Sequence, residues 1–418
     1  MTSRAREQWI VLALLVVSVS INYIDRGNLS VAADRLADEL KLNPTQVGLL
    51  LSGFFWTYAG LQIFSGWLID RYHVYWIYGA GFLVWSVATG LTGLAHGFWM
   101  IFALRLLLGS GESVAYPSYS KIICAGFPEQ QRGLANALID IGSKSGPALG
   151  LMIGGTIVSR FGWRNMFFAI GLASLIWLIP WTVMTRRATR VSAALYDSDE
   201  SSPGWREILR QRSAWGTFLA LFCGNYAWYF LLTWLPWYLV RERHYSIERM
   251  AVLGSLPFWG VGFASIASGW VSDRLVARGG SPTVVRKSFA VGGMLLAMLM
   301  LPVAVLKDET AAMACLMTAC VSFGFYSSHP WLITQRLAGP QAAGRWSGFQ
   351  NAIGNLAGVS APVITGWIVD KTGQFFYAFV VVAGVLALGA ASYLVLVGPI
   401  EPIAWKPKRF GTPASPAL

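Results

Sequence analysis

The ionisable residues inside long apolar stretches are the first candidates for chemistry in this sequence. The second-half counterparts of the segments that carry them hold no such charges, and His329 is the nearest equivalent there. An ionisable group within a membrane span is costly, so it is a functional candidate by default. We therefore expect the charged chemistry in the N-terminal half. The candidates are Asp25, Arg26, Arg105, Glu112, Asp140 and Lys144.

The spacing of these residues favours one shared site. Arg105 and Glu112 are two helical turns apart and would lie on one face of a helix. Asp140 and Lys144 are one turn apart and could pair directly. Cations and anions balance in this set, which lowers the cost of burying them. Two interpretations stay open: the groups bind substrate and protons, or they only neutralise one another and hold helices together.

The composition indicates a protein surrounded by a lipid bilayer. Of the 418 residues, 55% are hydrophobic and only 12% are charged, whereas a soluble protein carries about a quarter charged residues. The formal charge of +12 could suggest nucleic acid. However, the basic residues fall in short loops between apolar stretches, so we expect no nucleic-acid partner.

Apolar stretches long enough to cross a bilayer as helices recur along the chain. Most loop cations lie on the side of the termini, which predicts that both termini are cytoplasmic. The expected fold is all-α with twelve transmembrane helices in two bundles of six. The expected parts are an N-terminal bundle (1–185), a cytoplasmic linker (186–213), a C-terminal bundle (214–400) and a cytoplasmic tail (401–418). The expected spans are 9–32, 46–69, 75–95, 98–122, 132–159, 165–185, 214–240, 250–272, 286–306, 311–334, 346–369 and 374–397.

A short motif at the end of the second span returns at the end of the eighth. It reads Gly-Trp-Leu-Ile-Asp-Arg in residues 66–71 and Gly-Trp-Val-Ser-Asp-Arg in residues 269–274. Such an internal repeat is typical of a carrier built from two similar halves. The motif resembles the loop motif of the major facilitator superfamily. That resemblance implies a conformational latch formed by Gly66, Asp70, Arg71, Asp273 and Arg274.

Further motifs narrow the resemblance to one family. Asn-Tyr-Ile-Asp-Arg-Gly-Asn-Leu in residues 22–29 is similar to the first-helix signature of the anion:cation symporters, which include bacterial carriers of sugar acids. Phe-Trp-Thr-Tyr in residues 55–58 with Gln62, Arg105 to Pro117, and Gly-Phe-Gln-Asn in residues 348–351 extend the likeness along the chain. The implied fold is the major facilitator fold, and the implied activity is proton-coupled transport of an organic anion.

The resemblance also implies roles for single residues. Asp25 and Glu112 would exchange protons, and Arg105 would tune Glu112. Arg26 would engage a substrate carboxylate or stabilise the charged form of Asp25. The remaining implied contacts to substrate are Tyr23, Tyr58 and Asn351.

The sequence departs from the family around residue 143. Sugar-acid carriers tend to place a glutamine there, whereas this chain offers Ser143 or Lys144. A lysine adds a second cationic anchor beside Arg26 and favours a substrate with more negative charge or fewer hydroxyls. His329 and Trp331 would contribute to an aromatic wall of the binding site.

Other functions remain as alternatives. An anion exchanger or exporter would use the cations alone, although Asp25 and Glu112 would then have no purpose. A substrate sensor would be expected to carry a signalling domain. No cluster of catalytic or metal-ligating residues is visible in the sequence. We therefore expect that the protein is not an enzyme and that it binds no cofactor and no metal. We expect a monomer in the cell inner membrane, with a small organic anion and protons as its partners.

Overall fold

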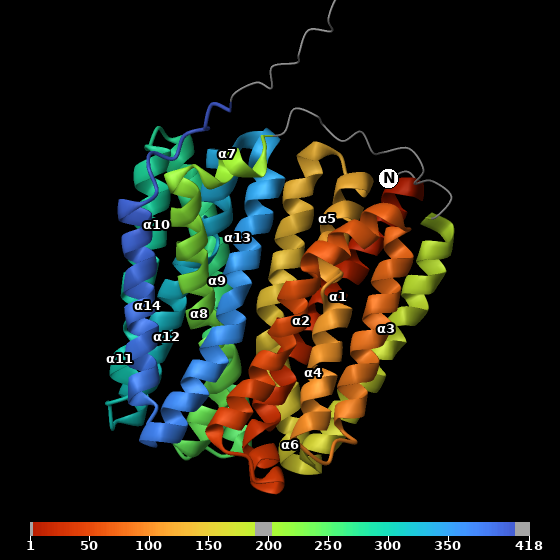
Figure 1. Ribbon diagram of the computed structural model, residues 1–418, viewed down its shortest axis with the longest axis vertical. Coiled ribbons are helices and arrows are strands. Elements are labelled where there is room, and N and C mark those ends of the chain that lie inside the picture. The colour runs from red at the N-terminus through yellow and green to blue at the C-terminus, as the bar shows by residue number, and fades with distance from the viewer. Residues whose placement is uncertain (1–2, 189–202, 406–418) are drawn as a thin grey trace, which may run out of the picture.

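The computed structural model describes residues 3–188 and 203–405, which form helices and their connections (Figure 1). Within these ranges the structure contains no strand. The helices are α1 (Ser3–Leu40), α2 (Pro44–Arg71), α3 (Val74–Thr92), α4 (Phe98–Glu112), α5 (Ala115–Gly126), α6 (Glu129–Ala188), α7 (Trp205–Leu209), α8 (Arg212–Arg241), α9 (Ile247–Ala277), α10 (Pro282–Ala297), α11 (Met300–Val303), α12 (Glu309–Ser327), α13 (His329–Thr372) and α14 (Phe376–Val395).

Twelve crossings account for these helices, as the sequence predicts. Among the described residues, ten stretches are long and apolar enough to span a membrane, and one of them, Leu134–Thr185, has 52 residues. This stretch crosses twice, because α6 is broken at Gly162, whose φ of 83° is outside the helical range. The helix α2 has 28 residues and supplies the twelfth crossing. A second break at Gly339, with φ of 64°, divides α13 between two crossings.

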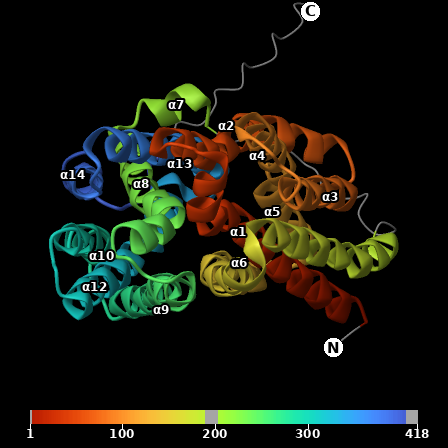
Figure 2. The same cartoon turned by 90° about the horizontal axis from the view of Figure 1, so that it is seen from below.

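The helices form two bundles that face each other. Figure 2 shows α1 to α6 on one side and α8 to α14 on the other. Between the bundles, α2 packs on α13, α6 packs on α9, and α1 packs on α8. Large aromatic side chains fill the bundle interiors: Tyr78, Phe82, Trp177 and Trp181 contact one another in the first bundle. The interface between α1, α2, α6, α8, α9 and α13 is where a site shared by both bundles can form.

The two ends of the molecule are distinguished by where the chain begins and ends, and at one of them the bundles meet closely. We call one the termini end, where α1 begins, α14 ends and α7 lies (Figure 1). At the opposite end α2 and α13 are in backbone contact: a Cβ on Gly48 would lie 2.5 Å from the carbonyl oxygen of Pro362, and one on Gly366 would lie 2.4 Å from that of Pro44. Any side chain larger than hydrogen would push the bundles apart here.

Ionic and polar contacts reinforce the opposite end. Arg241, at the end of α8, forms ion pairs with both Asp34 and Asp38 of α1. The Thr45 hydroxyl donates to Asp370 at 2.8 Å. These contacts join the two bundles, and sequence analysis did not anticipate them. The only signal in the sequence is their position. Asp34 and Asp38, one turn apart, follow the end of the first predicted span, and Arg241 follows the end of the seventh.

Half of the predicted segment between the bundles lies outside the described residues. Of the predicted linker 186–213 and tail 401–418, residues 189–202 and 406–418 are not described. The described part of the linker contains α7, which packs against α8 and α13. Arg345 of α13 donates to the carbonyl of Pro203 at 2.6 Å and lies over the ring of Trp205.

Candidate functional site

The charges of α1 and α4 form one buried cluster. Arg26 Nε donates to Glu112 Oε2 at 2.8 Å, and the two side chains are 2% and 0% exposed. Asp25 is also buried, and its Oδ1 accepts a hydrogen bond from Asn28 Nδ2 at 3.1 Å. Arg105 is buried beside them. The sequence predicts one shared site for six ionisable residues; the structure brings these four together, whereas Asp140 and Lys144 of α6 have other partners.

The guanidinium of Arg26 lies among aromatic rings. Its Cζ is 4.7 Å from the ring centre of Tyr23, 5.0 Å from that of Phe54 and 4.5 Å from that of Tyr58. Cations are attracted to aromatic faces, so these rings fix the side chain without neutralising its charge. Arg26 Nη2 has no hydrogen-bond partner among the described residues. A buried donor without a partner marks a place where a ligand acceptor would be favourable.

Arg105 binds the backbone of α1. Its Nη1 and Nη2 lie 3.4 Å from the carbonyl oxygens of Asp25 and Arg26. The predicted tuning of Glu112 by Arg105 would act through charge across this cluster, because no direct hydrogen bond between the two side chains is formed in the described part of the chain. The observed contacts instead hold α1 at the two residues that carry the chemistry.

The second bundle faces this cluster with amide and aromatic groups. Tyr229 of α8 donates its hydroxyl to Asn355 Oδ1 at 2.8 Å, and its ring lies 4.4 Å from that of Phe55. Asn351 Nδ2 donates to Gln62 Oε1 on α2 at 3.3 Å. Gln62 is one turn beyond Tyr58, which lies against Arg26, so Asn351 contacts the first bundle one turn from this cluster. The predicted contact of Asn351 with the substrate stays a prediction.

The residues around position 143 separate into different roles. The buried Ser143 hydroxyl turns back to its own helix and donates to the carbonyl and to Oδ1 of Asp140. Lys144 does not form an ion pair with Asp140; its Nζ lies 4.9 Å from the ring centre of Trp228 on α8. The direct Asp140–Lys144 pair, which sequence analysis left open, is therefore absent from this structure.

Two predicted members of the aromatic wall lie apart from the Arg26 cluster. His329 is fully buried and stacks on Phe289 of α10 at 5.1 Å, inside the second bundle. Trp331 is 36% exposed near the start of α13. Neither contacts Arg26, Asp25 or Glu112. Their predicted binding role stays a prediction, and this placement adds nothing to support it.

The residues of the predicted latch lie at the termini end. Asp273 pairs with Arg286 of its own bundle at 2.5 Å, and Arg274 lies over the ring of Trp270. Arg71 lies over Trp67 in the same way, and a Cβ on Gly66 would meet nothing within 4 Å. The Asp70 side chain lies outside the described residues. The latch between the bundles stays a prediction, since the contacts formed here are within each bundle.

Tyr116 and Asn22 were not singled out as site residues by sequence reasoning. The hydroxyls of Tyr116 and Tyr23 are 3.2 Å apart, which continues the site from α1 to α5. Asn22 is fully buried one turn before Arg26. Asn22 belongs to the helix-one motif, which could have indicated it, whereas nothing in the spacing of Tyr116 pointed to this contact.

Comparison with known proteins agrees with this architecture. Residues 15–362 match the Major Facilitator Superfamily. A probable galactarate/D-glucarate transporter of Bacillus subtilis (strain 168) is 31% identical over 96% of this chain and 94% of its own length. The hexuronate transporter of the same organism is 32% identical over 93% of this chain and 94% of its own length.

A solved structure has the same fold. The crystal structure of a bacterial homologue of the human lysosomal transporter Spinster, in an inward-facing and occupied conformation, superimposes with a TM-score of 0.78. It covers 93% of this chain and 96% of that chain, at 19% sequence identity.

Two bundles of membrane-spanning helices around a central polar cluster define a multi-pass membrane transporter. The chain belongs to the Major Facilitator Superfamily, in a group whose relatives carry sugar acids and other organic anions.

Proposed function

We propose that the protein is a secondary active transporter that takes up a small organic anion together with protons by alternating access. It would act as a monomer in the cytoplasmic membrane of a bacterium, with both termini on the cytoplasmic side. The relatives named for galactarate, glucarate and hexuronate support a sugar acid or a related carboxylate as the substrate. The excess of cations in the loops of the termini end supports this orientation.

The buried pair between Arg26 and Glu112 carries the proposal. Asp25 and Glu112 balance Arg26 and Arg105, so the four buried side chains are together neutral when all are ionised. Burying an unbalanced charge in a medium of low dielectric is costly. A proton added to Glu112 would leave one positive charge in excess, which a substrate carboxylate would neutralise. The charge balance thus couples each proton to one negative charge of the substrate.

The geometry supports the same exchange at the level of atoms. Arg26 Nε is bound to Glu112 at 2.8 Å, while Nη2 has no partner in the described chain. Protonation of Glu112 would weaken the bond to Nε and make both donors available to an anion. An arginine with two parallel donors matches the geometry of a carboxylate. Asn351, Tyr23 and Tyr58 would contact the rest of the substrate.

The closed opposite end indicates which step of the cycle is seen. The bundles meet at Gly48 and Gly366 and through Arg241 at that end. In the proposed orientation this end faces outward, so the outward side is closed in this structure. The halves would then rock about the Arg26 cluster to open this side.

Purified protein in liposomes with an inward-directed proton gradient would test the proposal. We would follow uptake across a panel of sugar acids, dicarboxylates and sulfonated acids, with Asp25→Asn and Glu112→Gln alongside. Symport predicts accumulation only with the gradient, and the two variants should lose accumulation but retain counterflow. Uptake that ignores the gradient, with both variants behaving as wild type, would instead establish an anion exchanger.

A further inference from the structure

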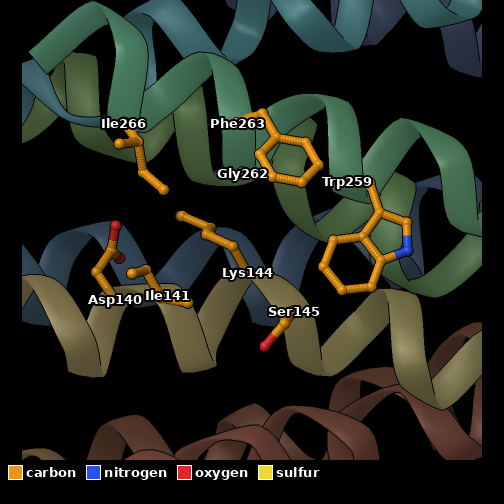
Figure 3. Close-up of a pocket in the computed structure, with 8 residues that line it drawn as sticks. All are labelled: Asp140, Ile141, Lys144, Ser145, Trp259, Gly262, Phe263 and Ile266. Carbon is orange, nitrogen blue, oxygen red and sulfur yellow. The ribbon is translucent and has the colours of Figure 1, made fainter.

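Lys144 is a cation at the interface between the bundles without an anionic partner. Its side chain is half-buried, and no carboxylate forms an ion pair with it in residues 3–188 and 203–405. Figure 3 shows the side chain extending from α6 into the gap before α9, where Phe263 and Ile266 face it. The helices are close here because Gly262 has no side chain: a Cβ at that position would lie 3.3 Å from Lys144 Cβ.

Asp140, one turn before Lys144 on the same helix, does not form an ion pair with it. Asp140 lines the same small pocket as Lys144. However, its side chain is exposed and accepts a hydrogen bond from Ser143 at 3.1 Å. The Lys144 ammonium lies instead over the ring of Trp228, 4.9 Å from its centre. An aromatic face attracts a cation but cannot neutralise it, so the charge stays available to an anion.

The position of Lys144 relative to Arg26 follows from the helices between them. Two residues after Lys144, a Cβ on Gly146 would lie 2.5 Å from Tyr23 Cβ, so α6 is in direct contact with α1 at this level. The ring of Tyr23 in turn lies against the Arg26 guanidinium. On α8, Trp228 contacts Lys144, and the next residue, Tyr229, packs against Phe55, whose neighbour Phe54 lies against the Arg26 guanidinium. Both cations are therefore linked through ring contacts to consecutive residues of the same helix.

We propose that the Lys144 ammonium and the Trp228 ring form a second anion subsite, which binds the distal anionic group of a substrate whose first carboxylate is held by Arg26. The substrate class is then a small dianion with a negative group at each end. This inference rests on the proposed function, since it assumes that Arg26 holds a substrate carboxylate. It adds a residue that discriminates dianions from monoanions.

The two subsites differ in how they become available. Arg26 is paired with Glu112 and needs a proton on that carboxylate before it can bind an anion fully. Lys144 has no ion pair to break, because its contact with Trp228 is with the ring face. A dianion can therefore replace the ring contact of Lys144 without further proton uptake. The second negative charge of the substrate is neutralised by the protein itself.

Matched pairs of ligands would test the subsite in binding measurements on purified protein. D-Gluconate and D-glucarate have the same carbon chain and differ by one carboxylate, as do D-galactonate and galactarate; glycolate and sulfoacetate differ by a sulfonate. We expect at least one dianion to bind about tenfold or more tightly than its monoanionic match, the range expected for a charge-assisted contact. Lys144→Gln should abolish this advantage and leave monoanion affinity within about twofold. Lys144→Arg should retain it.

Arg164→Gln is the matched control, because it removes another cation of α6 that pairs with Glu39 away from the site. It should not change the ratio of dianion to monoanion affinity. The subsite is wrong if no dianion of the panel binds more tightly than its match, or if Lys144→Gln keeps the preference. Gradient-driven accumulation tests the proposed function separately: symport of a monoanion without dianion preference would reject the subsite alone.

Discussion

The two bundles are similar in fold but differ in the chemistry that they bring to their interface. The first bundle supplies the buried charges of Asp25, Arg26, Arg105 and Glu112. The second faces them with the hydroxyl of Tyr229 and the amides of its α13 helix, which bind each other and α2. An internal repeat therefore fixes the architecture of both halves, while the polar residues have diverged between them.

From this difference we infer a division of roles in the proposed transport cycle. Charged groups change their interactions strongly with a proton, whereas hydroxyl and amide groups do not titrate in the physiological range. The first bundle is thus suited to respond to protons and to the substrate charge. The second bundle is suited to position the substrate and close over it. Substitutions in the two bundles should differ accordingly in the size of their effects.

The largest effect is expected at Arg26. Arg26→Met would leave Glu112 as a buried charge without its partner, at a cost of about 3–5 kcal/mol. Transport should fall by about a hundredfold or more, and the thermal unfolding temperature should drop in a fluorescence melt. The double variant Arg26→Met with Glu112→Gln should recover the unfolding temperature without recovering transport. Retained transport in the single variant would contradict a role of Arg26 in binding.

A smaller effect is expected at Arg105, which contacts the carbonyls of Asp25 and Arg26. Arg105→Gln would remove two charge-assisted hydrogen bonds, each contributing about 1.5–3 kcal/mol. At 3.4 Å both bonds are long and weak, so we expect the two together to contribute about 1.5 kcal/mol, which corresponds to about a tenfold loss of transport rate. Arg105→Lys keeps the positive charge but lacks the two guanidinium nitrogens that contact α1, so it should recover part of the transport rate lost in Arg105→Gln. Equal rates for Arg105→Gln and wild type would show that the cluster holds α1 without this residue.

The second bundle should respond more weakly. Tyr229→Phe removes the hydrogen bond to Asn355 and keeps the ring contact with Phe55. A neutral hydrogen bond contributes about 1 kcal/mol, so we expect about a fivefold increase in the KM for uptake at little change in proton coupling. Tyr377→Phe, at an exposed tyrosine of α14, is the control. A loss of proton coupling in Tyr229→Phe would contradict the division of roles between the bundles.

The smallest effect is expected where the bundles are joined by exposed charges. Arg241→Ala removes the pairs with Asp34 and Asp38, which are worth less than about 1 kcal/mol each at such exposure. Spin labels placed on the two bundles at the opposite end should show a roughly two- to fivefold larger open population. Arg164→Ala breaks a comparable pair within the first bundle and should leave this population unchanged. The same shift in both variants would mean that Arg241 has no specific role.

Much of this organisation could be predicted from the sequence, because it depends on properties that are local in the chain. Apolar length predicts the twelve crossings, and the cost of charge in lipid singles out Asp25, Arg26, Arg105 and Glu112. The breaks at Gly162 and Gly339 fall between predicted spans. These features are set within one helix or its immediate connection.

Other features depend on contacts between helices that spacing does not define. Asp140 and Lys144 are correctly spaced for an ion pair on a helix, yet Ser143 binds Asp140, and Trp228 from the other bundle attracts Lys144. His329 follows two serines and is expected in the binding site, but its ring stacks on Phe289 inside the second bundle. The choice among possible partners is made by tertiary packing, which a single sequence does not show.

The pairing of one arginine with two aspartates at the opposite end has a consequence for the setting in which the carrier works. These side chains are 41%, 14% and 59% exposed, so dissolved ions can approach them. At physiological ionic strength the screening length is about 8 Å, and it shortens as salt rises. In the proposed orientation, concentrated salt outside the cell would thus weaken the contacts that close this end and favour its opening. The external ionic strength would act on the resting conformation directly, before any substrate or proton is bound.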